Sequence, residues 1–194
     1  MKNLVTLKDG TEVTIRPMKK DDLEKSFSFF RSLPDRDRTY LRADVSRREV
    51  VKRRIDRMRT GTVKRLVALA GGRIVADGAL EWTGEDWKEH VGELRLIVAS
   101  QFKRKGLGTT MARELYTLAA REKVDEIVVK MMRPQKAARS IFRKLGFRQE
   151  TMLPEYVKDL RGKKQDLIVM RCNLEDLLQE LKQDMAESDW GRTR

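Results

Sequence analysis

The first candidate for a chemical role is a short basic segment that contains two glycines. The segment comprises Lys103, Arg104, Lys105, Gly106, Leu107, Gly108 and Thr109. Strand-forming residues 92–98 precede it, and apolar residues at helical spacing follow it to about Lys123. A strand, a glycine-rich loop and an immediate helix place free backbone N–H groups and a helix N-terminus at one point, which favours phosphate binding. The alternative is a plain turn with solvated lysines, because Gly-x-Gly alone is a weak motif.

Two nucleotide-binding motifs with similar glycines fit this segment less well. The Rossmann fingerprint needs a third glycine where Met111 stands. It also needs an acidic residue at the end of the next strand, where Lys130–Arg133 lie. The Walker pattern is absent from the sequence. We therefore do not expect either of these nucleotide-binding folds.

The remaining chemistry is limited by residue types that are scarce in the chain. Cys172 is the single cysteine and His90 the single histidine. A disulfide framework, a Cys/His zinc site and a His-dependent catalytic triad are therefore excluded. Catalysis must rest on carboxylates, tyrosine, lysine, the lone cysteine or backbone amides, and no metal is expected. Cys172 lies in a strand of hydrophobic residues, which predicts a position in the core.

The charge of the chain favours an anionic partner. The 194 residues include 43 Lys or Arg and 30 Asp or Glu, a formal net charge of +13. Thirteen of these cations and five of the carboxylates lie between Arg31 and Arg65. This region could face an acidic acceptor, a nucleic acid or a ribosomal surface. It could equally be a solvated helix face, and nucleic acid is not favoured because few aromatic residues are interleaved for stacking on bases.

The spacing of apolar residues predicts one α+β domain over residues 1–172, with a mainly antiparallel sheet. Helices are expected from Asp21, from Ser46, after Gly106 and over Gln135–Leu145, and strands over 4–7, 12–16, 65–70, 73–82, 92–98, 127–131, from Phe147 and over 167–172. Residues 173–194 are expected to form an amphipathic helix, capped by Asn173, and a frayed tail. Two copies could form a homodimer through this helix. We find neither a signal sequence nor a membrane span, and expect a cytoplasmic protein.

The glycine-rich segment resembles the signature of the GNAT superfamily of acetyl-CoA-dependent N-acetyltransferases. That signature is Arg/Gln-x-x-Gly-x-Gly/Ala after a central strand, and it reads Lys103-x-x-Gly106-x-Gly108 here. A second segment, Gln135-x-x-Ala138-x-x-x-Phe142-x-Lys144-Leu145-Gly146-Phe147, is similar to the family's Asn-x-x-Ala-x-x-x-Tyr-x-Lys-x-Gly-Phe. The resemblance spans roughly Thr14 to Arg171, and residues 9–17 and 29–33 also look like the opening of the GNAT domain in bacterial protein-lysine acetyltransferases. It implies a mixed, mostly antiparallel sheet flanked by helices.

This resemblance implies that acetyl-CoA is the co-substrate and binds residues 103–109, with Gln135 and Arg139 from the second segment. A backbone N–H near Val98 would stabilise the charge that develops on the thioester oxygen. Lys103 replaces the usual Arg or Gln and keeps a cation. Gln135 replaces the usual Asn and keeps an amide. Phe142 replaces the Tyr that protonates the leaving thiolate in many relatives. That role is vacant or filled elsewhere.

Two residues are candidates for proton transfer. Glu93 lies ten positions before Lys103, where the resembling protein acetyltransferases carry their catalytic carboxylate, so it is the implied general base. The alternative is an exposed Glu93 that pairs with a basic neighbour. Tyr156 is a candidate proton donor, or else a surface aromatic near a turn.

The expected function is transfer of an acetyl group from the CoA thioester to a primary amine by direct attack. The acceptor would be a small molecule or a protein lysine, in acidic surroundings that Arg47, Arg48, Arg53, Arg54 and Arg57 would attract. The competing hypothesis is a non-catalytic module that binds polyanions or nucleic acid and retains the GNAT fold.

Overall fold

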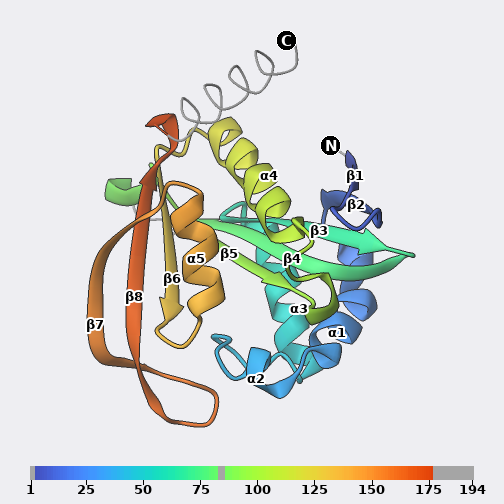
Figure 1. The fold of residues 1–194 in the computed structure, drawn as a ribbon, viewed down its shortest axis with the longest axis horizontal. Helices are drawn as coiled ribbons and strands as arrows, with labels where there is room; N and C mark the ends of the chain where they lie inside the picture. The colour runs from blue at the N-terminus through green and yellow to red at the C-terminus, as the bar shows by residue number, and fades with distance from the viewer. Residues whose placement is uncertain (1–2, 83–85, 177–194) are drawn as a thin grey trace.

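The computed structural model describes residues 3–82 and 86–176, which are built around one eight-stranded sheet (Figure 1). The strand order is β1-β2-β3-β4-β5-β6-β8-β7. Every pair of neighbours is antiparallel except β5 and β6, which are parallel. The strands are β1 (Asn3–Thr6), β2 (Glu12–Pro17), β3 (Val63–Ala70), β4 (Arg73–Trp82), β5 (Val91–Val98), β6 (Glu126–Met132), β7 (Arg148–Lys158) and β8 (Lys164–Asn173).

Helices cover both faces of the sheet. The longer helices are α1 (Leu23–Ser32), α3 (Arg48–Asp56), α4 (Leu107–Arg121) and α5 (Lys136–Lys144), and α2 (Asp35–Arg38) is a single turn. One hydrophobic cluster packs α4 and α5 against the sheet, and a second packs α1 and α3 against it from the other side. Nearly all of β4 is buried because it lies between these two layers. Within the described ranges no helix has the length and apolar composition that a membrane span requires.

Glycines shape the local geometry at two of the predicted boundaries. Gly71 and Gly72 have φ values of 53° and 76° and form the two-residue turn between β3 and β4. Two consecutive left-handed residues match the twist of a tight hairpin, and glycine adopts them without strain. Gly146, with a φ of 84°, follows Leu145, the residue that caps the end of α5. The predicted hairpin and the predicted end of this helix are both confirmed.

The turn between β7 and β8 reaches the helical layer around α2. In Figure 1 this turn extends toward α2, and the Leu160 N–H donates a hydrogen bond to the Thr39 carbonyl over 3.0 Å. The α2 region and the β7–β8 hairpin are thereby joined on the side of the sheet that carries α1 and α3.

The start of the C-terminal helix agrees with the sequence. The Asn173 side-chain oxygen accepts hydrogen bonds from the N–H groups of Glu175 and Asp176, at 2.9 and 3.2 Å. Asn173 is therefore the predicted N-cap. The rest of the predicted helix, and with it the predicted homodimer contact, lies outside the described residues.

Candidate active site

The predicted phosphate-binding segment connects the end of β5 to the start of α4. Gly106 precedes the helix with a φ of 89°, a left-handed value that suits glycine. The first backbone N–H groups, from Leu107 to Thr109, have no intrahelical acceptor, and among the described residues no side chain caps them. Free N–H groups and the positive end of the helix dipole favour anions, and the phosphate-binding role stays a prediction.

Two of the three cations in this loop are held by carboxylates. Lys105 Nζ lies 2.8 Å from Asp9 Oδ2, and Lys103 Nζ lies 2.7 Å from Asp37 Oδ2. The hydrogen bond from Lys105 is the main reason why the pKa of Asp9 falls to about 2. Arg104 is exposed, and within residues 3–82 and 86–176 it has no ion-pair partner. The loop therefore offers one uncommitted cation, and two that a phosphate would share with these carboxylates.

The strands β5 and β6 separate beside this loop. Their parallel pairing covers only Val91–Glu93 of β5, although both strands continue. The Ala99 N–H donates to the carbonyl of Val75 in β4 over 2.9 Å. Because successive amides of a strand point to opposite sides, the Val98 N–H points away from β4 and into the opening. That is the direction in which a donor to a bound thioester oxygen would have to point.

The helix α5 brings the second predicted segment to the same place. A Cβ atom added at Gly108 would lie 3.6 Å from Ile141 Cδ1 and 3.8 Å from Val98 Cγ2. The start of α4, the end of β5 and α5 are therefore neighbours. Thr109 and Arg139, the other cofactor-binding candidates on these helices, are half-buried.

Two residues of the second segment have structural roles. The Gln135 Oε1 accepts a hydrogen bond from the Met132 N–H over 2.8 Å, which closes the turn from β6 to α5. Only its amide NH₂ group is left for the contact that the resemblance implies. Phe142 is buried, with its ring 5.2 Å from that of Phe147 in an edge-on arrangement. A phenyl ring in the core offers no proton to a leaving thiolate.

Glu93 lies among three cations, on the opposite face of the sheet from the Val98 side chain. Its Oε2 is 3.1 Å from Lys130 Nζ, and its Oε1 pairs with Arg42 and lies 3.5 Å from Arg95 Nε. Burial acts to raise the pKa of Glu93, but the charges of Arg42, Lys130 and Arg95 outweigh it and hold the pKa below its usual value. Glu93 is thus an ionised carboxylate that is already engaged with cations.

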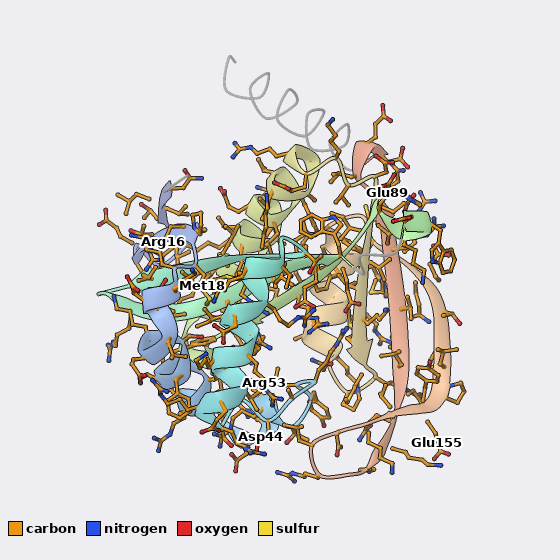
Figure 2. All side chains as sticks on the ribbon, turned by 180° about the vertical axis from the view of Figure 1, so that it is seen from behind. Arg16, Met18, Asp44, Arg53, Glu89 and Glu155 are labelled. Carbon is orange, nitrogen blue, oxygen red and sulfur yellow. The ribbon has the colours of Figure 1, made fainter. Side chains whose placement is uncertain are left out.

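Tyr156 lies elsewhere, on the edge strand β7. Its side chain is 66% exposed, and the pairing of β7 with β8 is irregular between Leu153 and Val157. Glu155, the preceding residue, lies on the outer hairpin in Figure 2. Among the described contacts none joins Tyr156 to Glu93 or to the glycine-rich loop. The position favours the surface aromatic over the proton donor, and the donor role stays a prediction.

Sequence reasoning did not select the cations around Glu93. Arg95 lies two residues further along the same strand, so the alternation of side chains could have placed it on the same face. Lys130 comes from β6, and Arg42 comes from the segment between α2 and α3. No local pattern connects these two residues to Glu93, because only the folded sheet brings them together.

Comparison with protein families and solved structures places the chain in a known family. The acetyltransferase (GNAT) domain model matches residues 12–148, and the chain therefore belongs to the GNAT acetyltransferase family. Membership of this family makes the protein an acetyl-CoA-dependent N-acetyltransferase, with acetyl-CoA as co-substrate. No curated protein sequence matches the chain significantly.

Three solved structures illustrate the shared fold. The ribosomal-protein-alanine N-acetyltransferase from Brucella melitensis has 20% identity and a TM-score of 0.71, over 82% of this chain and 98% of that one. A Salmonella typhimurium protein solved with its cofactor acetyl-CoA has 19% identity and a TM-score of 0.72, over 84% and 94%. The GNAT domain of S. lividans PAT has 16% identity and a TM-score of 0.72, over 89% and 96%.

Proposed function

We propose that the protein transfers the acetyl group of acetyl-CoA to a primary amine by direct attack, with Glu93 as the general base. The observation that carries the proposal is the junction of the uncapped start of α4 with the opening between β5 and β6. The first feature suits a pyrophosphate, and the second directs the Val98 N–H toward the place where a thioester would lie. The acceptor is a small molecule or a protein amine, and the likeness to a ribosomal-protein acetyltransferase supports the second.

The residues at this junction fit acetyl-CoA. When bound, acetyl-CoA supplies a thioester carbonyl carbon, to which the amine nitrogen bonds while the C–S bond breaks. Residues 103–109 would hold the phosphates through backbone N–H groups and the Arg104 guanidinium. The Gln135 NH₂ group and Arg139 would bind the remainder of the cofactor. The Val98 N–H would donate a hydrogen bond to the carbonyl oxygen as negative charge develops there.

The attacking amine must lose a proton during this reaction. An amine with a pKa of about 10.4 needs about 4.6 kcal/mol to become neutral at pH 7. Glu93 is the last β5 residue paired with β6, so its carboxylate lies where the opening begins. It would take the proton directly or through a water molecule, and a well-placed base contributes about 10² to 10⁴ in rate.

Binding of acetyl-CoA provides the test of this function. At 100 times its dissociation constant a ligand adds about 2.7 kcal/mol to the free energy of unfolding, so the melting temperature should rise. Gly108→Val should abolish the rise, because the added methyl groups would crowd the approach between Ile141 and Val98. Thr117→Val, an equivalent change on the exposed part of α4, should retain it.

The same measurement separates the enzyme from the non-catalytic alternative. If a polyanion such as heparin raised the melting temperature and saturating acetyl-CoA did not, the binding module would be the better description. Release of free thiol with a primary amine present, and not in its absence, would in turn establish the transfer.

A further inference from the structure

Cations outnumber carboxylates on the face of the sheet that carries Glu93. A connected set of ion pairs, which we call the arginine cluster, joins six cations to three carboxylates. The cations are Arg42, Arg54, Arg57, Arg65, Arg95 and Lys130, and the carboxylates are Asp77, Glu81 and Glu93. Within the cluster three positive charges therefore have no carboxylate of their own.

The inner part of the arginine cluster is structural. Arg65, Asp77 and Glu81 are buried, and the Arg65 guanidinium lies 2.8 Å from Asp77 Oδ1 and 3.3 Å from Glu81 Oε1. Arg54 lies 3.4 Å from the same Asp77 oxygen, with its guanidinium 4.8 Å from the centre of the Phe30 ring. These contacts fasten α1 and α3 to β3 and β4, and we assign no ligand to them.

The outer part of the arginine cluster is open to solvent and has more cations than carboxylates. The side chains of Arg42 and Lys130 are 39% and 40% exposed, and that of Arg95 is 26% exposed. The buried Arg95 Nε–H makes no hydrogen bond to the described residues, since Glu93 Oε1, its ion-pair partner, lies 3.5 Å away. Burial, with the nearby charge of Arg42, lowers the pKa of the Arg95 guanidinium from its usual value. A further carboxylate beside the exposed parts of the Arg42 and Arg95 side chains would relieve this repulsion.

We propose that the acceptor carries a carboxylate next to its reacting amine, and that Arg42 and Arg95 bind this carboxylate. The acceptor class is then an acidic peptide, with Asp or Glu beside the residue that is acetylated. Guanidinium groups match carboxylates with paired hydrogen bonds, which gives such a site its selectivity. This inference rests on the proposed function, because the arginine cluster adjoins Glu93.

Binding of such an acceptor would also release the base. Arg42 pairs with Glu93 in the structure, and its half-exposed side chain belongs to the segment between α2 and α3. When Arg42 moves to the acceptor carboxylate, Glu93 loses one of its three cations and becomes a better proton acceptor. As the N–C bond forms, the amine proton passes to Glu93 and the thiolate leaves. An amine without the acid would leave Arg42 on Glu93.

The test compares two product-like pentapeptides that contain a central acetyl-lysine, flanked on both sides by Asp in one and by Asn in the other. Their affinities for the full chain loaded with CoA are measured by titration calorimetry. The Asp peptide should bind at least tenfold more tightly, and Arg42→Gln should reduce this ratio to less than threefold. The matched control is Arg113→Gln, an exposed arginine on α4 that should leave the ratio unchanged.

These outcomes distinguish a specific carboxylate-binding site at Arg42 and Arg95 from general attraction by a basic protein. Equal affinity for the two peptides, no binding of the Asp peptide, or the same loss in Arg42→Gln and Arg113→Gln would overturn the proposal. Because product-like peptides need no turnover, this test does not depend on detecting acetyl transfer. Acetylation of the corresponding free-lysine peptides at equal kcat/KM would overturn the preference and leave the acetyltransferase function in place.

Discussion

At Glu93, burial and neighbouring charge act on the same carboxylate in opposite directions. Burial disfavours the charged form, and the cations of Arg42, Lys130 and Arg95 favour it more strongly. The net effect lowers the pKa, so Glu93 is ionised throughout the range in which the enzyme would be assayed. The rise of kcat/KM between pH 6 and 9 should therefore report the deprotonation of the acceptor amine. The part of the pH profile that reports protonation of Glu93 should lie below about pH 4.3, the ordinary pKa of a Glu side chain.

Replacement of this carboxylate is the prediction at the residue scale. Glu93→Gln should lower kcat about 100-fold, because a general base typically contributes 10² to 10⁴. The stabilisation by acetyl-CoA should persist, since the phosphate loop lies beyond the other end of β5. Glu89→Gln serves as the control, because Glu89 is exposed in the loop before β5 (Figure 2). A Glu93→Gln enzyme with wild-type kcat from pH 6 to 9 would remove Glu93 from the mechanism.

At the scale of elements, predictions succeeded where the signal is local. The helical spacing of α4 and the paired glycines of the β3–β4 turn need only neighbouring residues, and the structure confirms both. The full length of β7 could not be predicted, because nearly all its side chains are exposed and show no alternation. The opening between β5 and β6 depends on where a long-range pairing stops after Glu93. Arg42 reaches Glu93 from a distant loop. Sequence motifs therefore predict a cofactor site at the glycine-rich loop but do not reveal the cations around Glu93.

A charged pair connects the end of β2 to the start of α1. Arg16 and Asp22 form two parallel hydrogen bonds of 2.7 and 2.8 Å, and Asp22 also accepts the Lys19 N–H. The hydrogen bonds from Arg16 are the leading reason why the pKa of Asp22 is lowered. Asp22 is buried, so this pair fixes the entry of the chain into α1.

The stability of this junction should depend on pH with a defined sign. The folded-state pKa of Asp22 is below its unfolded value of about 3.9, so the stabilisation is present above that value. It is lost as the pH falls through the folded-state pKa. Arg16→Gln should lower the free energy of unfolding by about 2 kcal/mol at pH 7, measured with urea, and by less at pH 3. Lys20→Gln, a nearby exposed control, should show neither effect, and an equal deficit of Arg16→Gln at both pH values would contradict this account.

At the scale of the whole molecule, the basic region from Arg31 to Arg65 divides into groups with different roles. Arg54 and Arg65 belong to the arginine cluster, which corrects the expectation that Arg54 is a free surface charge. Arg48 pairs with Glu24 of α1, and other cations remain exposed on α3. The region is thus partly a solvated helix face and partly a buried network beside Glu93. Only the exposed remainder can attract a partner over a distance.

The exposed cations that lie outside the arginine cluster should raise the rate of encounter with acidic acceptors. With free-lysine peptides flanked by Asp or Asn, about 1 M salt shortens the Debye length to roughly 3 Å and screens exposed charges. The kcat/KM for the Asp peptide should fall about tenfold, and that for the Asn peptide much less. The double variant Arg47→Glu with Arg53→Glu should reproduce the loss at low salt, because both residues are exposed. Acetyl-CoA affinity is measured at each salt concentration, so that its own weakening can be removed from the ratio. If the two peptides lose kcat/KM equally, the exposed arginines serve only as a solvated face, and any preference for acid must arise at Arg42 and Arg95.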